Sequence, residues 1–432
     1  MYNIAFYIQN TNYEVIDFRH PELGNPGVGG TPYMIMLVAT ELARRYCDIH
    51  VFLYLSKEVE CDKSLTPVVG FGLQEAALDA DRRGIKFFVF DYKLACWWTE
   101  KSFAGLSKEM NLLPWTHTFP FIHDLNVIAK HPNVKKIINV GREEKDIFLD
   151  HPAFDKMDYI YNAVPVDDDY ISKGKNNPYN EREHIVTFMG SLTPHKCFHI
   201  IAEIWPYILK KVPDAELYVI GTGDLYGNTC TLGRFGLSEQ NYEDKFMKFL
   251  TDDKGKILSS VHFSGKLGNE KYDILSKTRV GVPNPTGKSE TFCICAVEMQ
   301  AMGCSVVAMS ASGYYDTFYN GKIVRNKRQL VDTIIRLLVG EAPKRYNDTL
   351  NYINQNFSIE VVVKRWRDLL DDLSKKVGNE RKCEESYTNK AFRFKWVKII
   401  NRKLMQWCPC LYYKPIEYYL QKMNRNPDYS LY

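Results

Sequence analysis

Apolar residues in the first part of the chain gather in short runs of strand length, and helical patterns fill the intervals between them. Two intervals show clear helical periodicity, from about Thr31 to Tyr46 and from about Leu73 to Arg83. Strands that alternate with helices are typical of a parallel sheet covered on both faces. The predicted strands are Ile4–Ile8, Asp48–Leu55, Gly84–Asp91, a short strand within Leu112–Phe121, Val134–Val140 and Tyr159–Val164.

A polar stretch from residue 165 to residue 183 interrupts this pattern, and we expect a loop and a domain boundary there. The alternation then restarts, which predicts a second Rossmann-like domain after the first. In such domains ligands bind at the carboxyl ends of the strands. The strands predicted for the second half are Ile185–Met189, Glu216–Ile220, Val261–Phe263, Val280–Val282 and Ser305–Met309.

The stretch from Arg279 to Gly303 combines a strand, a loop rich in Pro and Gly, and a helix predicted over Thr291–Met302. Glu290 stands just before this helix and Glu298 stands inside it. The unpaired amides of a helix N-terminus attract phosphate, and five helical residues span about 7–8 Å. The two carboxylates are therefore spaced to bind the sugars on either side of a diphosphate. An amphipathic helix with one capping and one exposed glutamate is the alternative.

The sequence ETFCICAVEMQAMG, which follows a strand and a loop containing Asn-Pro, resembles the E-x7-E segment of retaining glycosyltransferases of family 4. These enzymes have the GT-B fold, an α/β fold of two Rossmann-like domains that face each other across a cleft. The resemblance implies an N-terminal acceptor-side domain over residues 1–165 and a nucleotide-sugar domain over residues 166–357. It further implies a crossover helix over residues 358–378 that returns to the N-terminal domain, followed by a basic tail over residues 379–432.

The same resemblance implies a metal-independent enzyme that moves a hexosyl or N-acetylhexosaminyl group from a nucleoside diphosphate to a glycan or lipid-linked acceptor. Glu298 would bind ribose, Glu290 would bind the donor sugar, and the main chain around Phe292, Cys293 and Ile294 would bind the diphosphate. No dedicated nucleophile is evident, so the acceptor proton would leave through the donor phosphate. The expected product is a bacterial surface polysaccharide, such as capsule or O-antigen.

The turn from Gly190 to Lys196 resembles the G-R-x4-K-G element of the same family. Gly190 and Lys196 match this element, but Ser191 occupies the arginine position and Cys197 replaces the last glycine. Lys196 would balance the charge that develops on the leaving diphosphate, a role that usually dominates catalysis. A solvated surface lysine is the alternative.

The missing arginine leaves the expected diphosphate site one cation short. Lys288, two residues before Glu290, is the nearest replacement in sequence. Lys266 is another candidate, and together with Leu267 it follows a predicted strand. We therefore include all three in the expected donor site.

Two further features in the first half are expected to face the ligand. Gly29 and Gly30 precede a predicted helix and resemble the first glycine-rich loop of the family, although a plain turn is the alternative. His117 resembles an active-site histidine that many relatives carry near the 6-position of the donor sugar. His123 competes for this role, and a structural histidine remains the alternative for both.

A metal site is not expected. Asp79 and Asp81 form a D-x-D pattern of the kind that holds a metal in the other major glycosyltransferase fold, but two arginines follow it at a predicted helix end. The acidic run over residues 167–169 lies in the polar linker. Both patterns are typical of solvated charge. No His, Cys or Asp cluster has metal-ligand spacing, so we predict no cofactor besides the sugar nucleotide.

The composition, 45% hydrophobic and 25% charged over 432 residues, is typical of a soluble globular protein with two domains. The eleven cysteines are scattered without a disulfide framework. No leader pattern and no apolar run long enough to span a membrane stand out. These features predict a reduced, cytoplasmic protein.

The charge is concentrated at the end of the chain. Residues 389–432 hold nine Lys and Arg against two acidic residues, a net of +7, so the remainder carries −3 of the total +4. This distribution argues against a general nucleic-acid binder. A helix over Phe392–Trp407 would gather apolar residues on one face, with Lys395, Lys398 and Arg402 opposite. Such a helix suits the anionic inner face of a membrane, or it packs on the protein's own N-terminal domain.

Two alternative functions remain open from the sequence. The first is a non-catalytic partner subunit that binds sugar nucleotide, for which Ser191 is the only support. The second is a phosphorylase or sugar-nucleotide epimerase on the same scaffold. The absence of a recognisable cofactor-lysine motif weighs against this second alternative.

Overall fold

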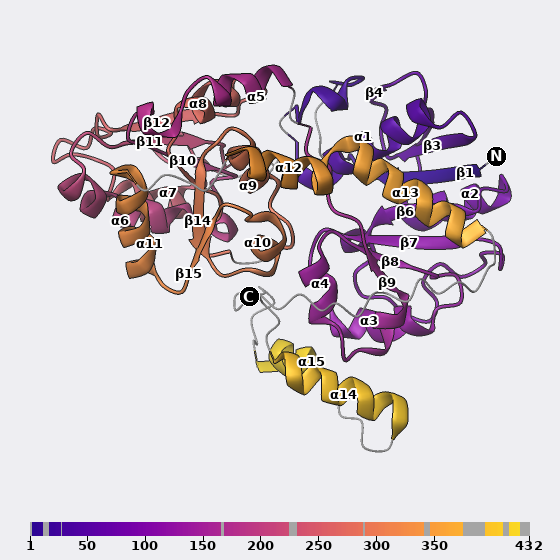
Figure 1. Ribbon diagram of the computed structural model, residues 1–432. Helices are drawn as coiled ribbons and strands as arrows, with labels where there is room; N and C mark the ends of the chain where they lie inside the picture. The colour runs from indigo at the N-terminus through magenta and orange to yellow at the C-terminus, as the bar shows by residue number, and fades with distance from the viewer. Residues whose placement is uncertain are drawn as a thin grey trace. The chain divides into compact units, whose positions relative to one another are not determined.

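The computed structural model describes residues 2–11, 17–26, 28–165, 168–223, 231–287, 290–340, 346–374, 394–408 and 414–423. These residues form two compact units (Figure 1). The N-terminal unit comprises the described residues within Met1–Pro21, Thr31–Ala163 and Ile359–Leu431. The C-terminal unit comprises those within Glu22–Gly30 and Val164–Ser358.

A parallel sheet of seven strands forms the centre of the N-terminal unit, in the order β5-β3-β1-β6-β7-β8-β9. Its central strands are continuous apolar runs, as expected for a parallel sheet that is buried on both faces. A separate pair joins β2 (Asp17–Phe18) to β4 (Glu60–Cys61). The sheet strands are β1 (Tyr2–Ile8), β3 (Ile49–Leu55), β5 (Thr66–Val69), β6 (Phe87–Asp91), β7 (Asn111–Thr116), β8 (Ile137–Asn139) and β9 (Met157–Tyr159).

Helices cover this sheet. Residues of α2 and α3 share one apolar cluster with Phe88 and Phe90 of β6. On α13, Trp366 packs its ring against Phe6 of β1 and Trp115 of β7, with centroid distances of 6.0 and 4.8 Å. The α-helices with all or most of their residues in this unit are α1 (Gly30–Arg45), α2 (Leu73–Arg82), α3 (Ile122–Lys130), α4 (Arg142–Ile147), α13 (Ile359–Ser374), α14 (Lys395–Trp407) and α15 (Ile416–Met423).

The C-terminal unit is built on a parallel sheet of six strands, in the order β12-β11-β10-β13-β14-β15. Along the chain, β10, β11 and β12 follow one another toward one edge of the sheet. The strands β13, β14 and β15 then extend from the other side of β10 toward the opposite edge. The strands are β10 (Ile185–Met189), β11 (Glu216–Ile220), β12 (Val261–Gly265), β13 (Val280–Val282), β14 (Ser305–Met309) and β15 (Lys322–Val324).

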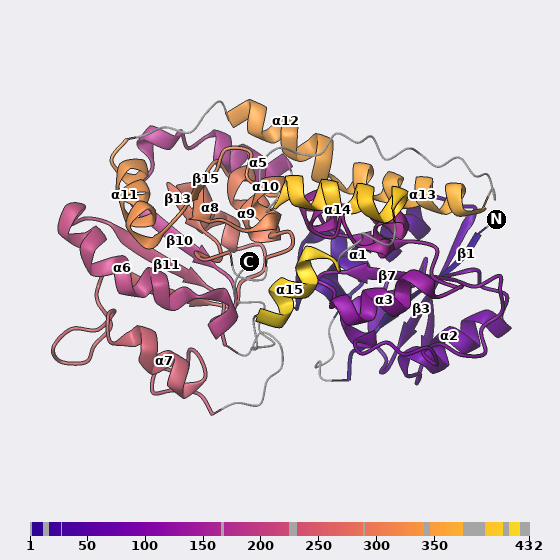
Figure 2. The same cartoon turned by 90° about the horizontal axis from the view of Figure 1, so that it is seen from below.

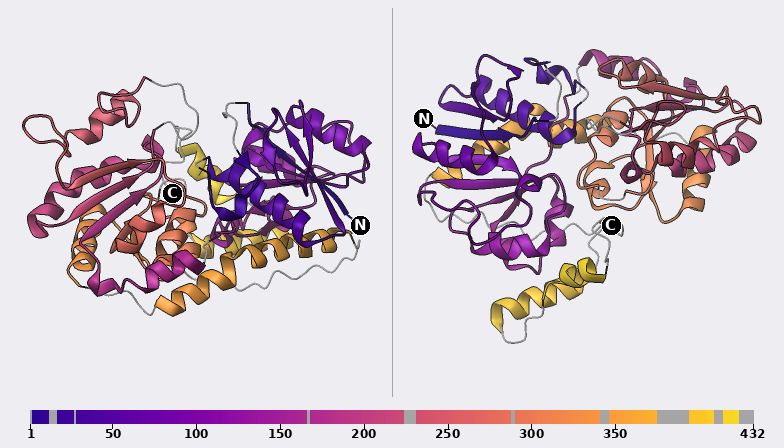
Figure 3. Two further views of the ribbon diagram at one scale, coloured as in Figure 1. Left: turned by 90° about the horizontal axis from the view of Figure 1, so that it is seen from above. Right: turned by 180° about the vertical axis from the view of Figure 1, so that it is seen from behind.

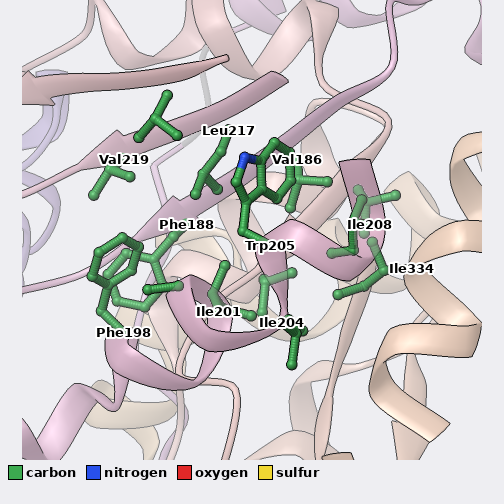
Figure 4. Packing of buried hydrophobic residues seen from close by; sticks show 14 of the residues in the cluster. Val186, Phe188, Phe198, Ile201, Ile204, Trp205, Ile208, Leu217, Val219 and Ile334 are labelled. Atoms are coloured by element: carbon green, nitrogen blue, oxygen red, sulfur yellow. The ribbon is translucent and has the colours of Figure 1, made fainter. Parts of the chain in front are cut away.

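The core of this unit has two apolar layers, one on each face of the sheet. Helices α6, α7 and α11 form the larger layer, in which Trp205 of α6 lies beside Val186 and Leu217 of the strands (Figure 4). Helices α8 and α9 form the other, with Leu275 and Met299 buried. The helices are α5 (Asp168–Lys175), α6 (Phe198–Lys211), α7 (Gln240–Met247), α8 (Lys271–Lys277), α9 (Ile294–Ala301), α10 (Ser312–Thr317), α11 (Lys327–Leu338) and α12 (Tyr346–Phe357).

Two sequence-based element predictions are wrong. The strand predicted over Tyr159–Val164 does not form, because β9 ends at Tyr159 and the amide of Val164 instead donates to the carbonyl of Phe357 at 2.8 Å. The loop predicted over residues 165–183 contains the helix α5. Acidic residues in its first turn and lysines in its last turn favour this helix, because they complement the helix dipole.

The described part of the tail forms two helices, α14 and α15. The helix α14 was predicted over Phe392–Trp407, but residues 375–393 lie outside the described residues, including Phe392 and Arg393. Helix α15 contacts α3, and Figure 2 shows it there. Among the described helices, none combines the length and the apolar character needed to cross a bilayer.

Candidate active site

The strand order of the C-terminal unit reverses between β10 and β13, so the loops that follow these two strands lie next to each other. In parallel sheets of this kind, ligands bind at such a switch point. The loop after β10 carries Lys196 and the loop after β13 leads to Glu290. The structure therefore brings together two side chains that the sequence separates widely.

Two polar contacts join these two loops, Lys196 to Glu290 and Asn284 to His195, and a third links Asn284 to Glu290 within the loop after β13. Lys196 Nζ donates to Glu290 Oε1. Asn284 Nδ2 donates to the carbonyl oxygen of His195 at 3.0 Å and to Glu290 Oε1 at 3.3 Å. The Glu290 side chain is 8% exposed and that of Lys196 is 31% exposed. The Lys196 side chain is thus partly accessible to a ligand, whereas the Glu290 carboxylate is held in place.

Tight main-chain packing supports the loop after β10. The amide of Gly190 donates to the carbonyl of Ile220, and that of Leu192 donates to Thr222, both at 3.0 Å. Gly221 has a φ of 133°, and a Cβ atom at this position would overlap the carbonyl oxygen of Gly190. Only glycine fits this position, both in conformation and in space.

Replacing Gly221 by alanine is expected to lower the free energy of unfolding by at least about 2 kcal/mol, because backbone strain and steric overlap act together. Gly236→Ala is the matched control, since its φ is also positive, at 69°, but no atom lies within 4 Å of the added Cβ. Urea denaturation of both variants measures the difference. Equal losses of stability would contradict the close approach of Gly221 to Gly190.

The start of α9 is fixed from the side by α10. Cys293 precedes the helix with a left-handed backbone, at φ 83° and ψ 75°. The amide of Gly313 and the hydroxyl of Ser312 donate to the carbonyl oxygen of Glu290, at 3.1 and 3.3 Å. A Cβ on Gly313 would lie 2.6 Å from the amide nitrogen of Phe292. The first amides of α9, which carry a partial positive charge, therefore follow a rigidly held Glu290.

Glu298 lies in the middle of α9 and has a lysine partner of its own. Lys271 Nζ, from the first residue of α8, is 2.6 Å from Glu298 Oε1. The hydroxyl of Tyr272 donates to the same oxygen at 3.3 Å. The side chains of Lys271 and Glu298 are 7% and 8% exposed, so this is a buried ion pair. The ammonium group compensates the charge of the carboxylate in a place where an isolated charge would be unfavourable.

The charges of both ion pairs act on the pKa of Cys295, which lies in the first turn of α9. The pKa of Cys295 is raised to about 12, mainly by burial and also by the carboxylates of Glu298 and Glu290, while Lys196 and Lys271 oppose this rise. Two carboxylates and two ammonium groups therefore surround one helix N-terminus. An entering diphosphate would find two cations and a set of main-chain amides there.

The C-terminal unit also matches a known family. Residues 183–339 match the family model described as Glycosyl transferases group 1. No curated protein matches the chain.

Solved structures resemble the chain over most of its length. The structure of HepE from Anabaena in complex with UDP has a TM-score of 0.59 at 13% identity, covering 86% of this chain and 100% of its own. A glycosyltransferase from Rickettsia africae has a TM-score of 0.59 at 12% identity, with coverage of 87% and 99%. AviGT4, a glycosyltransferase involved in avilamycin A biosynthesis, has a TM-score of 0.55 at 15% identity, with coverage of 87% and 99%.

This protein has the GT-B fold. The two parallel sheets and their covering helices confirm the predicted pair of Rossmann-like domains. At these identities the similarity to the solved structures is one of fold.

The glycine-rich loop of this GT-B protein groups with the C-terminal unit. A Cβ on Gly30 would lie 3.8 Å from Ile294 Cδ1, at the first residue of α9. Gly29, the preceding residue, is buried. A Cβ on Gly24 would lie 2.7 Å from Asn269 Oδ1. The loop therefore reaches the helix start that the two ion pairs surround.

The position of the missing arginine offers no cation. Ser191 is 1% exposed, and its hydroxyl lies 3.1 Å from that of Thr193. Lys266 is exposed after β12. Lys288 lies outside the described residues. Lys271, which sequence reasoning missed, is the cation that the structure adds to the site.

Two of the predicted donor-binding side chains pack in the core. Phe292 is 2% exposed and meets the ring of Phe357 edge-on, at a centroid distance of 5.3 Å. Leu267 packs on the apolar cluster beneath α8 and α9. Both side chains support the loops from below, and only their main-chain groups are in a position to meet a ligand.

His117 belongs to the N-terminal unit and directly follows β7. Its ring lies against that of Trp115 at a centroid distance of 4.6 Å. Burial lowers the pKa of His117 to about 3, so the imidazole is neutral at physiological pH. His123 is exposed, with Nδ1 3.2 Å from Asp124 Oδ1. Of the two, His117 is therefore the one whose ring is packed against the protein.

The D-x-D carboxylates make structural contacts. Asp79 accepts hydrogen bonds from the hydroxyl of Tyr54 at 2.8 Å and from Arg83 at 2.6 Å. Asp81 accepts from the amide and the hydroxyl of Ser107, both at 2.6 Å. Throughout the described part of the chain, no group of three or more His, Cys, Asp or Glu residues is arranged to hold a metal ion.

Sequence reasoning missed three contributors to the site, Asn284, Lys271 and Tyr272. Asn284 stands between two prolines at a strand end. This pattern predicts a loop, but it does not predict the contact of Asn284 with Glu290. Lys271 and Tyr272 open a short helix with no recognisable motif, and only the fold brings them to Glu298.

Proposed function

We propose that this protein transfers a sugar from a nucleoside-diphosphate sugar to an acceptor glycan. The observation that carries the proposal is the pair of glutamates around the start of α9, each held by a lysine, at the switch point of the C-terminal sheet. The match of this unit to glycosyl transferases group 1 supports it. The GT-B fold of the whole chain supports it as well.

Each charged residue has a distinct role in this proposal. Glu298 accepts hydrogen bonds from the ribose hydroxyls, and Lys271 compensates its charge. Glu290 accepts from the hydroxyls of the transferred sugar. Lys196 leaves Glu290 for the diphosphate and balances the charge that develops when the sugar departs. The amides that follow Cys293 bind the same phosphates.

Lys271 also accounts for the missing arginine. The family element has two cations in the loop after its first strand, whereas this chain has Ser191 in place of one of them. The positive charge of Lys271 opposes the rise in the pKa of Cys295, in the first turn of α9, and the charge of Lys196 does the same. In our proposal the second positive charge therefore comes from α8 instead of from the loop after β10.

The finer features of the proposal follow from the family resemblance. The transfer retains the configuration of the sugar, as in family 4, and the acceptor proton leaves through the donor phosphate. His117 bonds to the donor sugar as a neutral imidazole. The product belongs to a bacterial surface polysaccharide. UDP-sugars are the first donors to test, since the solved HepE complexes contain UDP and UDP-glucose.

A donor screen tests the proposal. UDP-, GDP- and ADP-sugars are added separately to the protein, and the melting temperature and the release of nucleotide are recorded. One nucleotide series is expected to raise the melting temperature and to be hydrolysed slowly without acceptor. With an acceptor glycan, the anomeric configuration of the product, measured by NMR, is expected to match that of the donor. Absence of both stabilisation and hydrolysis in all three series would contradict the proposal.

Activity is expected to be unchanged in excess EDTA. The physical reason is that two lysines and a helix N-terminus supply the positive charge that a metal provides in other enzymes. Initial rates with and without EDTA measure this. A loss of activity that magnesium or manganese restores would overturn the prediction and direct attention back to Asp79 and Asp81.

A further inference from the structure

Helix α14 turns its polar side toward the N-terminal unit. Lys398 Nζ is 2.6 Å from Glu417 Oε1 of α15, and 2.6 Å from the carbonyl oxygen of Ile147. The side chains of Lys398 and Glu417 are almost completely buried. Asn401 Nδ2 donates to Asp150 Oδ2 at 2.8 Å. The basic face that the sequence predicts on this helix is therefore largely used within the protein.

The other side of α14 is apolar and exposed. Trp396, Ile400 and Trp407 are 74%, 58% and 83% exposed. Their spacing places them in one stripe along the helix, with the exposed Lys403 among them. Val397, beside the stripe, is 48% exposed. Helices of globular proteins normally have the reverse orientation, with the apolar stripe toward the core.

Polar contacts prevent the helix from rolling over to bury this stripe. A rotation about the helix axis would separate Lys398 from Glu417 and leave two buried charges without compensation, which is strongly unfavourable. It would also break the pair between Arg402 and Asp155, whose atoms are 2.7 Å apart. The outward direction of Trp396 and Trp407 is therefore a stable property of the tail. Figure 3 shows α14 at the periphery of the N-terminal unit.

We infer that the exposed stripe of α14 docks on an anionic phospholipid surface. Tryptophans at both ends of the stripe match the preference of this side chain for the boundary between headgroups and acyl chains. Lys403 can lay its methylene stem along the apolar layer while its ammonium reaches the headgroup phosphates. The exposed Lys414 and Lys422, near and on α15, add positive charge close by. The helix would lie in the interface, as amphipathic anchors do.

This inference changes which residues bind the membrane. Of the two alternatives that the sequence leaves open, the membrane one places Lys398 and Arg402 against the lipid, but in the structure both are paired with acidic residues of the protein. Apolar insertion therefore provides most of the affinity, and the remaining exposed lysines provide the preference for anionic lipid. The inference is independent of the proposed sugar transfer.

The test is sedimentation of the full-length protein with vesicles. Vesicles of phosphatidylglycerol and phosphatidylcholine are compared with vesicles of phosphatidylcholine alone. The wild-type chain is expected to sediment with the anionic vesicles. The combined substitution Trp396→Gln, Ile400→Gln and Trp407→Gln is expected to weaken this binding at least about tenfold, because three large apolar contacts are lost. Lys403→Gln is expected to reduce the preference for anionic vesicles.

A matched control removes exposed apolar side chains elsewhere. Tyr207 and Val339 of the C-terminal unit are 67% and 61% exposed, and Tyr207→Gln with Val339→Gln is expected to sediment like the wild type. Wild-type sedimentation of the triple variant would overturn the inference. A large fall in its melting temperature would show instead that the stripe is covered by the chain itself. Conversion of a wild-type dimer to a monomer by the triple variant would assign the stripe to a second copy.

Discussion

Glu290→Gln is expected to lower kcat about 10²–10³-fold and to leave the donor KM nearly unchanged. The glutamine keeps the size of the side chain but loses the charge that Lys196 and the donor hydroxyls share. Hydrogen bonds to the transferred sugar strengthen as positive charge develops on it, so their loss is felt in the transition state more than in the ground state. Initial-rate kinetics over a range of donor concentrations measure both constants.

Glu183→Gln is the matched control for this substitution. Glu183 lies in the same unit with its side chain exposed, and its replacement is expected to leave both constants at their wild-type values. Wild-type kcat in the Glu290 variant would remove the proposed role of this carboxylate. A rise in KM without a change in kcat would assign Glu290 to ground-state binding instead.

Lys271→Met is expected to lower the free energy of unfolding by about 3–5 kcal/mol, because it leaves the buried Glu298 without the ammonium group that compensates its charge. Adding Glu298→Gln to this variant is expected to restore more than half of the loss, since the uncompensated charge disappears. Urea denaturation of the two single variants and the double variant gives the three free energies. A double variant no more stable than Lys271→Met would contradict the buried pair.

The same variants separate folding from donor binding. Glu298→Gln is expected to weaken binding of the nucleotide about 10- to 100-fold, because hydrogen bonds to a charged acceptor contribute about 1.5–3 kcal/mol. The double variant is expected to bind at least as weakly, since it also lacks the ammonium group of Lys271, although its stability has largely returned. Recovery of nucleotide affinity together with stability would show that Glu298 acts only on the fold.

The sequence was sufficient for most of the sheet strands, because they are short apolar runs bounded by Gly, Pro or polar residues. It predicted β10, β11, β13 and β14 with the bounds that the structure has. It missed α5, because a run of polar residues has the composition of a loop even when its charges are ordered to favour a helix. It also missed β5, a four-residue strand at the edge of the sheet with only partial burial.

The candidate site was only partly predictable. The spacing of Glu290 and Glu298 lies within one segment, so the sequence contains it. The partnership of Glu298 with Lys271 depends on where α8 packs against α9, and no local pattern encodes that. For α14, periodicity identifies the two faces of the helix but does not determine which one packs. The buried pair between Lys398 and Glu417 decides this, and it involves a residue from the next helix.

The most direct test of the account is a calorimetric titration of wild-type protein and Lys196→Met with a nucleoside, its monophosphate and its diphosphate. The base is the one selected by the donor screen, and Lys254→Met, an exposed lysine of the same unit, is the control. The wild-type and control proteins are expected to bind the diphosphate most tightly. Lys196→Met is expected to lose about tenfold or more of the affinity for the diphosphate while it binds the nucleoside as before. Equal affinity of Lys196→Met and wild type for the diphosphate would contradict a diphosphate site at the switch point of the C-terminal sheet.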